Sequence, residues 1–401
     1  MDRNIDKLKN VFYVGHIGAE GTAMAIHTRN IAKLLNGYGY NVSFICQCVP
    51  KKHKRYSEDD YYNYFYTKQY IKIPKLSAIE WMIEEMSGIK LFNLFKNTLN
   101  NEGIDLVIFY GYSGEKKIID FCKRKKIKVL IDRTDWFEKD DRKGLFGKIF
   151  TKYCADKCIK KYDFYADGVI SISKFFYDFY KKQGQNTFWM PPIFEVPKKD
   201  KIEIKVKSKE VIRLVYAGSL GETKDIIDPI IEILLNKYNK DKIKFTLDLV
   251  GINNDQLNVK FGKNNWERYG VFAHGRLPHS ETVKIISNSD FSFLLRHNKR
   301  YAKAGFSTKF AESMSYGVPV ICTQVGGADL LIKNMKNGIL LKDNKKDTIE
   351  SVLSKIINFT EEDIYYMKNN AYRDALRYFD YNSYEQKFNK FIKDDINILW
   401  N

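Results

Sequence analysis

The chain has 401 residues, of which 44% are hydrophobic and 15% are aromatic, and its formal net charge is +18. This composition excludes a largely disordered protein, and the length predicts about two domains with separate cores. No run reaches the roughly 18 apolar residues of a membrane-spanning helix, and the N-terminus lacks the apolar centre of a signal peptide. We expect a cytoplasmic protein and leave open its peripheral attachment to the inner face of the cell membrane.

The positive charge limits the partners only in part. A basic surface attracts nucleic acid, acidic substrates or anionic membranes. The same excess of lysine is also typical of an AT-rich genome. Because the sequence contains no recognisable nucleic-acid-binding module, we expect no nucleic-acid partner.

The cysteines predict no metal site. Cys46 and Cys48 lie two residues apart at the end of an expected strand, and Cys154 and Cys158 lie one helical turn apart. Neither pair has the spacing of a zinc site, and few histidines are near. We therefore expect reduced thiols.

The first half of the chain begins as a βαβ unit. The sequence predicts a strand over 10–15, a loop with Gly15, Gly18 and Gly21, a helix over 22–36 and a strand over 41–47. Residues 51–75 are polar and rich in tyrosine, and their pattern assigns no element. The alternation continues with helices over 77–100, 116–128, 143–165 and 174–182 and with strands over 105–110, 128–132 and 168–173.

The glycine loop after the first strand has two interpretations. A dinucleotide-binding fingerprint requires G-x-G-x-x-G and an acidic residue after the second strand. This chain has G-x-x-G-x-x-G from Gly15 to Gly21, and its second strand ends in Gln47. We therefore expect that this loop does not bind NAD. A glycine turn that binds no ligand remains an alternative.

Two of the expected helices are basic. Residues 116–128 carry seven Lys or Arg against one Asp, and residues 143–165 interleave lysines with leucine and phenylalanine. Helices of this kind form the solvated outer face of an α/β layer, or they lie on an anionic membrane surface. The sequence does not decide between the two.

The second half restarts the alternation of strands and helices. Strands are expected over 213–218, 244–251, 271–275, 290–296, 318–323 and 337–342. One helix is expected to start at Asp228 as its cap, with Pro229 in the first helical position. Further helices are expected over 281–287 and through most of 348–401. We divide the chain into a first domain over 1–196 with 384–401, a charged linker over 197–210, and a second domain over 211–383.

The stretch 303–327 combines a helix start, a short amphipathic helix and a buried strand. Gly305 gives a flexible approach, and Ser307 or Thr308 caps the helix, whose first N–H groups stay free to bind an anion such as a diphosphate. Gly317 ends the helix. Helical spacing predicts a core face of Phe306, Phe310 and Met314 and a second face of Lys309, Glu312, Ser313 and Tyr316.

The residues from Ala304 to Ser313, Ala-Gly-Phe-x-Thr-Lys-Phe-x-Glu-Ser, resemble the donor-site signature E-x7-E of retaining GT-B glycosyltransferases of family 4. They look most like the version found in bacterial capsule and cell-surface polysaccharide enzymes. Glu312 matches the second Glu, which in that family binds the nucleotide ribose. The first Glu falls on Ala304, so this chain departs from the family in how the hydroxyls of the donor sugar are held.

The resemblance implies a fold and an activity. The fold is GT-B, with two Rossmann-like α/β domains facing each other across a cleft and a C-terminal helix over 384–399 that crosses back to the first domain. The activity is transfer of a sugar from a nucleotide-sugar, UDP by default, to a glycan or polyprenyl-linked acceptor in cell-surface polysaccharide synthesis, with retained configuration. The family needs no bound metal, and the sequence has no D-x-D pair at a strand end to hold one.

Ligands of open α/β sheets gather at the carboxyl ends of the strands. From this rule and the resemblance, we predict a donor nucleotide and diphosphate site of Lys224, Arg276, Arg296, Gly305, Ser307, Thr308, Lys309 and Glu312. In the family a basic pair steadies the leaving diphosphate. Lys224 matches one member of that pair, and Arg296 or Lys309 supplies the second charge. The loop of Gly15, Gly18 and Gly21 is expected on the acceptor side.

Retention leaves open whether a side-chain base exists, because one proposal lets the leaving phosphate take the acceptor proton. Asp132 is the first side-chain candidate for catalysis, followed by His16 and Asp135. Each of these three is also explained as a turn or cap residue.

Two other functions fit the sequence. One is a GT-B enzyme of another kind, such as a sugar-nucleotide epimerase. The other is a degenerate, non-catalytic GT-B protein that binds membrane or nucleic acid through its basic surface, which the alanine at 304 keeps open. Turnover of a nucleotide-sugar favours the enzyme, and nucleic-acid binding with a steep salt dependence favours the binding protein.

Overall fold

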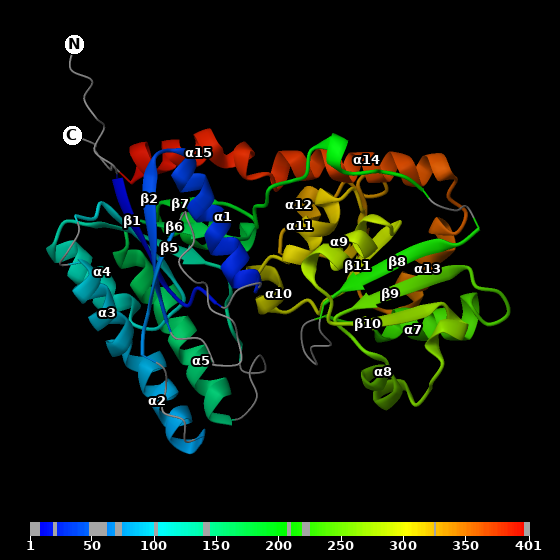
Figure 1. Cartoon of the computed structure of the whole chain (residues 1–401), viewed down its shortest axis with the longest axis horizontal. Helices are drawn as coiled ribbons and strands as arrows, with labels where there is room; N and C mark the ends of the chain where they lie inside the picture. Colours follow the sequence, from blue (N-terminus) through cyan, green and yellow to red (C-terminus); the bar gives the residue numbers. More distant parts are fainter. Residues whose placement is uncertain are drawn as a thin grey trace, which may run out of the picture. The chain divides into compact units, whose positions relative to one another are not determined.

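The computed structural model describes residues 9–18, 22–47, 62–68, 74–99, 103–138, 145–206, 210–218, 225–324 and 326–396. The chain divides into two compact units, Met1–Ile193 with Tyr384–Asn401, and Phe194–Ser383 (Figure 1). Each unit has one parallel sheet with helices packed on it. The expected α/β class with two Rossmann-like units is confirmed.

The first unit contains a seven-stranded parallel sheet in the order β3-β2-β1-β4-β5-β6-β7. Its strands are β1 Lys9–Gly15, β2 Tyr40–Cys46, β3 Asn63–Tyr66, β4 Leu106–Tyr110, β5 Lys128–Arg133, β6 Gly168–Ser171 and β7 Thr187–Trp189. Its helices are α1 Ala23–Gly37, α2 Pro74–Ser87, α3 Ile89–Leu99, α4 Glu115–Arg124, α5 Leu145–Lys157, α6 Lys174–Lys181 and α15 Glu385–Lys390. The strand order reverses between β1 and β4, and such a switch point is where open α/β sheets bind ligands.

The second unit repeats this plan with a six-stranded parallel sheet in the order β10-β9-β8-β11-β12-β13. Its strands are β8 Ile212–Ala217, β9 Phe245–Val250, β10 Val271–Gly275, β11 Phe291–Leu294, β12 Val320–Thr323 and β13 Gly338–Leu341. Its helices are α7 Asp228–Ile233, α8 Asn254–Phe261, α9 His279–Ser287, α10 Arg300–Ala304, α11 Thr308–Ser315, α12 Ala328–Leu331, α13 Lys346–Ile356 and α14 Glu361–Tyr378. Here the order reverses between β8 and β11.

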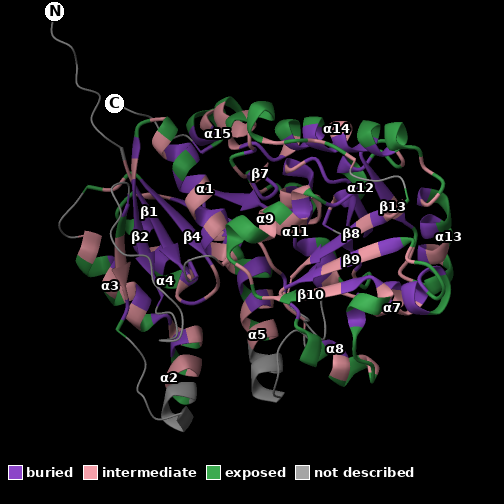
Figure 2. Ribbon diagram, turned by 45° about the vertical axis from the view of Figure 1, so that its right-hand side comes forward, coloured by how far each residue is buried: buried purple, intermediate pink, exposed green. Residues whose placement is uncertain are grey.

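The central strands are buried on both faces, as continuous apolar runs in a covered parallel sheet require (Figure 2). All five residues of β4 are buried. Helices add their apolar faces to these cores, and two of the described helices of the first unit start at side-chain caps. Thr22 accepts from the N–H of Ala25 at 3.3 Å, and Ser173 accepts from the N–H of Phe176 at 3.3 Å.

Four elements of the first unit differ from the expectation, and one of them is β7, a strand that the sequence did not predict. The unassigned tyrosine-rich segment contributes β3, which pairs with β2 at the sheet edge. The helix expected over 77–100 is two helices, because Gly88 breaks it at φ +57°. A Cβ atom at Gly88 would lie 2.1 Å from the Cα of Gly114, so this corner packs directly on the start of α4. The helix expected over 143–165 leaves α-helical geometry after Lys157.

The second unit brings two corrections. Asp228 is the first residue of α7 rather than its cap, and its carboxylate pairs with Lys260 at 2.6 Å. The segment expected as a linker packs on the second unit as far as residue 206. Ile202, Ile204 and Val206 are half-buried between exposed charged residues, and Val206 packs against the core. The unit boundary accordingly lies at Phe194 rather than at residue 197.

The C-terminal residues from Tyr384 belong to the first unit. The rings of Phe388 and Phe391 each lie 5.3 Å from the ring of Phe188, and the side-chain amide of Asn186 donates to the carbonyl of Asp395 at 3.0 Å. None of the described helices is long and apolar enough to cross a membrane. All five cysteines in the described part of the chain are free thiols.

Candidate active site

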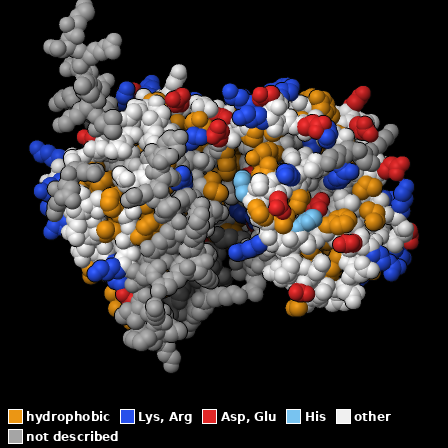
Figure 3. Space-filling view, in the orientation of Figure 1, with side chains coloured by type: hydrophobic (Ala, Val, Ile, Leu, Met, Phe, Trp, Pro, Cys, Tyr) orange, Lys and Arg blue, Asp and Glu red, His pale blue; other side chains and the backbone are white. Residues whose placement is uncertain are grey.

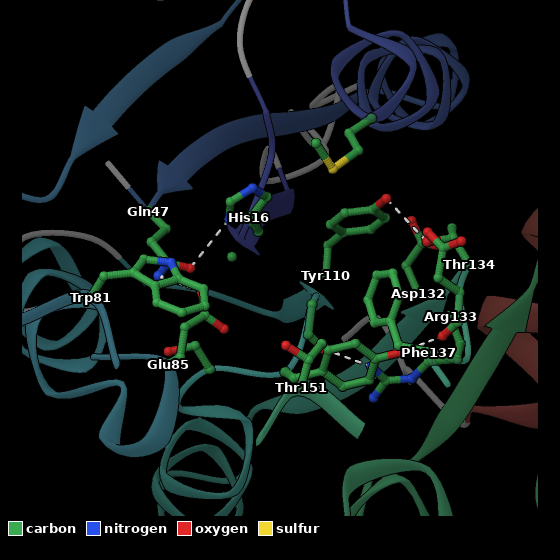
Figure 4. Close-up of a pocket in the computed structure, with 16 residues that line it drawn as sticks. His16, Gln47, Trp81, Glu85, Tyr110, Asp132, Arg133, Thr134, Phe137 and Thr151 are labelled. Atoms are coloured by element: carbon green, nitrogen blue, oxygen red, sulfur yellow. Dashed lines mark hydrogen bonds between the residues drawn. The ribbon is translucent and has the colours of Figure 1, made fainter. Parts of the chain in front are cut away.

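A cavity of about 220 Å³ opens at the carboxyl ends of β1, β4 and β5 in the first unit (Figure 4). Strand register places Gly15, Tyr110 and Asp132 in one row across these strands. The cavity is lined by Gly15, His16, Met24, Gln47, Trp81, Glu85, Tyr110, Gly111, Tyr112, Ser113, Asp132, Arg133, Thr134, Asp135, Phe137 and Thr151. The candidates Asp132, His16 and Asp135 thus meet in a single cavity.

Gly15 lets the first loop pass close to β4. Its φ is +134°, and a Cβ atom there would lie 1.9 Å from the carbonyl oxygen of Tyr110. Gly18, at φ +88°, is also in a conformation that side-chain-bearing residues avoid. Gly21 lies outside the described residues. The first two glycines therefore have a backbone reason to be glycine, and Gly15 also lines the cavity.

Asp132 is held rigidly at the end of β5. Its carboxylate accepts from the hydroxyl of Tyr13 and lies 2.9 Å from Nε2 of His27 on α1. Asp132 is 1% exposed and His27 is 4% exposed. Burial, followed by the charge of Asp132, raises the pKa of Tyr13 well above its usual value, so Tyr13 remains a donor. Two buried donors thus fix the carboxylate at the cavity wall.

His16 follows β1 and is half-buried at the other side of the cavity. Its Nδ1 lies 3.5 Å from Oε1 of Gln47, the residue after β2 (Figure 4). An imidazole in this place can donate to or accept from a hydroxyl group inside the cavity. The structure leaves this ring more accessible than the carboxylate of Asp132.

Arg133, next to Asp132, is the buried residue that sequence reasoning missed in this unit. Its guanidinium pairs with Asp163 and, at 2.6 Å, with Glu115, and it donates to the carbonyl of Gly111 at 2.6 Å. The ring of Tyr112 lies 4.7 Å from its central carbon. Burial raises the pKa of Glu115 well above its usual range, against the pull of Arg133. The arginine therefore serves the core beneath the cavity.

A second cluster lies at the switch point between β8 and β11 in the second unit. Asp225 accepts from Nε of Arg296 at 2.7 Å and binds the ammonium group of Lys309. The hydroxyl of Tyr216 lies 3.0 Å from both Asp225 and Lys309. A Cβ atom at Gly218 would lie 2.1 Å from Nζ of Lys309, so the glycine makes room for the lysine.

This cluster contains more positive than negative side chains. Asp225 is largely buried, and burial alone would raise its pKa, but Arg296 and then Lys309 outweigh burial and hold that pKa well below its usual value. Two cations thus share one ionised carboxylate. Among the described residues, the two terminal nitrogens of Arg296 have no hydrogen-bond partner, so the cluster keeps donors for a further anion.

Helix α11 buries the expected core face, but Ser313, which was expected on the second face, is also buried. Phe306, Phe310 and Met314 are buried, and the rings of Phe306 and Phe310 pack on Phe379 at 5.9 Å. The backbone of Ser307 begins the helix without a side-chain cap bond, which leaves the first N–H groups uncapped. Gly317 ends the helix at φ +70°.

Glu312 lies one turn after Lys309, with its side chain 20% exposed. Its carboxylate is 3.5 Å from Nδ1 of His279, at the start of α9. Burial raises the pKa of Glu312, and His279 opposes this effect. A carboxylate in this setting can accept two hydrogen bonds from neighbouring hydroxyls when it is ionised.

One predicted donor residue, Arg276, does not join this cluster. Arg276 follows β10, an edge strand three positions from β11 in the sheet, which corresponds to roughly 14 Å. Lys224 lies outside the described residues. Of the predicted donor set, Arg296 and Lys309 meet on Asp225, and Glu312 follows on the same helix as Lys309.

A family model described as glycosyl transferases group 1 matches residues 197–374. These residues include Asp225, Arg296, Lys309 and Glu312. This chain is a glycosyltransferase.

A curated relative is similar to this glycosyltransferase in sequence, and solved structures are similar to it in fold. The uncharacterized glycosyltransferase MJ1069 of Methanocaldococcus jannaschii is 25% identical over 364 residues, 86% of this chain and 87% of the relative. Sucrose-phosphate synthase from Thermosynechococcus elongatus has a TM-score of 0.69 at 13% identity, over 95% of this chain and 98% of that one. Anabaena Alr3699/HepE in complex with UDP has a TM-score of 0.64 at 14% identity, over 96% and 99%. The glycosyltransferase has the GT-B fold.

Ala304 stands where the E-x7-E pattern has its first glutamate. It ends α10 and is fully buried. The glycosyltransferase thus presents a methyl group at this position, and no carboxylate from it reaches a donor.

Asp225 and His279 are the charged neighbours that sequence reasoning missed in the glycosyltransferase domain. Asp225 directly follows Lys224 in a loop already selected as a strand end, so its position along the chain was the available signal. His279 is the first residue of α9, three positions after Arg276, and no local pattern connects it with Glu312. Both contacts arise from the sheet order.

Proposed function

We propose that this glycosyltransferase moves a sugar from a nucleotide-sugar, with UDP as the default nucleotide, to a glycan or polyprenyl-linked acceptor of a cell-surface polysaccharide. The observation that carries the proposal is the convergence of Arg296 and Lys309 beside the start of α11, with Glu312 one turn further on. Two cations suit a diphosphate, and the carboxylate suits the ribose hydroxyls.

The reaction we propose keeps the anomeric configuration. The bond between the sugar and the diphosphate breaks while the acceptor oxygen bonds to the same carbon from the same face. The acceptor proton goes to the leaving phosphate oxygen, so no side-chain base is required. Arg296 and Lys309 stabilise the negative charge that develops on the diphosphate, a task these cations can perform without a bound metal.

Binding of UDP, GDP and ADP by calorimetry, in metal-chelating buffer, tests the donor site. We expect the wild type to bind one of the three and Glu312→Ala to lose most of that affinity. Wild-type protein that binds none of them, or binds only with added divalent metal, contradicts the proposed donor site or its metal independence.

We also propose that the protein binds an anionic membrane surface, where it would meet the acceptor. On α2, Ile83 and Met86 are 57% and 64% exposed, and Tyr153 on α5 is 56% exposed. Lys117 and Lys157 line the same groove as Met86 and Tyr153. Exposed apolar groups bordered by lysines suit a surface of anionic lipids, where a polyprenyl-linked acceptor resides.

The alternative is a degenerate GT-B protein without catalysis, and the buried Ala304 is the observation that favours it. Among the described side chains on the face shown in Figure 3, Lys and Arg are spread over the surface and mixed with Asp and Glu, without one basic stripe for nucleic acid. Release of UDP from a panel of UDP-sugars distinguishes the two functions, because only the enzyme turns a donor over.

A further inference from the structure

The cavity in the first unit has the composition of a sugar site. Aromatic rings of Trp81, Tyr110, Tyr112 and Phe137 line it together with amide, hydroxyl and carboxylate groups (Figure 4). At about 220 Å³ it is smaller than the roughly 300–1,000 Å³ of pockets for drug-sized ligands, so it suits a single ring. The apolar face of a sugar packs on aromatic rings, and its hydroxyls need polar partners.

The charges of this cavity are opposite to those of the whole protein. Three carboxylates, Glu85, Asp132 and Asp135, line it, and no described lysine does. Burial raises the pKa of Tyr110, and the negative charges of Asp135 and Asp132 raise it further. Because Tyr110 lines the cavity, the negative potential of these carboxylates extends into the cavity. A chain of net charge +18 thus has an acidic cavity at a strand switch point.

Arg133 is the one guanidinium among the described residues at the cavity wall, and at Tyr110 it offsets the field of Asp135 and Asp132 only in part. It is 1% exposed, and its nitrogens are directed to Asp163, to Glu115 and to the carbonyl of Gly111. Two carboxyl groups and a carbonyl thus surround a single cation. A buried arginine with these partners has little charge left for a ligand.

We infer that the acceptor cavity takes an uncharged or amino sugar and rejects anionic sugars such as uronates and sugar phosphates. The inference rests on the proposed function, which makes this cavity the acceptor side. Glu85 is the half-buried carboxylate on α2, one turn after Trp81, so the same helix supplies the stacking ring and a negative charge. An anionic ring placed on Trp81 would face Glu85, and no lysine of the described part of the chain lines the cavity to pair with it.

Saturation-transfer NMR with methyl glucoside, glucosamine and glucuronate tests the inference on the full-length protein. We expect methyl glucoside and glucosamine to bind at least tenfold more tightly than glucuronate. Trp81→Ala is expected to weaken the two preferred sugars about tenfold. Equal binding of glucuronate, or no binding of any of the three sugars, overturns the inference.

Glu85→Gln separates the charge from the shape of the cavity. It is expected to raise the affinity for glucuronate relative to methyl glucoside severalfold. The matched control is Glu80→Gln, on the same helix, where Glu80 pairs with Lys90 and does not line the cavity. Unchanged discrimination in Glu85→Gln, or an equal change in Glu80→Gln, contradicts the role given to the cavity carboxylates.

A UDP titration of the same samples keeps the two proposals apart. Loss of sugar discrimination with intact UDP binding contradicts only the acceptor inference. Sugar discrimination without any nucleotide binding contradicts the proposed transfer and leaves the cavity as a neutral-sugar site.

Discussion

Asp225 and Arg296 are joined twice, by an antiparallel backbone bridge outside the strands of the sheet and by a 2.7 Å ion pair between Oδ1 and Nε. The pair holds the guanidinium of Arg296 through its Nε atom. Lys309 binds the other oxygen of Asp225. One buried carboxylate therefore orients two cations from different elements.

Replacing Asp225 by Asn should weaken UDP binding by about tenfold, because the two cations lose the charge that holds them. The affinity for uridine, which has no phosphate, should not change. Asp374→Asn is the matched control, since Asp374 is also a buried carboxylate that binds a lysine, Lys333. Tighter UDP binding by Asp225→Asn would show instead that Asp225 competes with the phosphate.

Replacing Lys309 by Ala should reduce UDP affinity by roughly 10–100-fold, since a charge-assisted contact of about 1.5–3 kcal/mol is lost. Lys224→Ala is expected to act in the same direction. Calorimetry with UDP and UMP checks this, and the loss should be larger for the diphosphate. Unchanged affinity in both variants contradicts the diphosphate assignment.

UDP affinity should depend on pH through Glu312. Burial raises the pKa of this carboxyl above its usual value of 4.5, while His279 opposes the rise. Because the ionised form accepts from both ribose hydroxyls, affinity should fall as the pH falls through the raised pKa, at a higher pH than for an ordinary glutamate. Titrations between about pH 8 and about pH 5 check this, with Glu312→Gln as the variant that should lose the dependence.

Replacing Arg133 by Ala should lower the free energy of unfolding by about 3–5 kcal/mol, because Asp163 and Glu115 would stay buried without their cation. Thermal or urea unfolding measures the loss. Lys160→Ala removes a surface ion pair between Lys160, which is 53% exposed, and Asp156. This control should change the free energy of unfolding by no more than about 1 kcal/mol. Similar losses in both variants would contradict the structural role of Arg133.

Replacing Ile83 or Met86 by Ser should weaken binding to vesicles rich in anionic lipid about tenfold, since each side chain would lose contact with the acyl region. Sedimentation with vesicles of phosphatidylglycerol and phosphatidylcholine measures this. Val259→Ser, on α8 of the second unit, is the control, because Val259 is 89% exposed and does not line the groove that contains Lys117 and Lys157. Equal binding by all variants would contradict membrane attachment through α2.

Local sequence signals located most strands and the helix α11. Period-2 and apolar runs mark β1, β4 and β8 because covered parallel strands must be apolar, and the glycines at 305 and 317 bracket α11. The same reasoning missed β3, whose tyrosines pack on a sheet edge, and it joined α2 to α3. Gly88 breaks that helix only because it must approach Gly114, a contact between residues distant in sequence.

The sequence by itself determined two Rossmann-like α/β units and the short motif from Ala304 to Ser313, because both depend on local patterns. Only the tertiary structure decided which charges meet. It placed Asp225 between Arg296 and Lys309, turned Arg133 into the core, and left Arg276 at an edge strand. Strand order brings side chains together over 70 or more positions of sequence, and no local periodicity encodes that order.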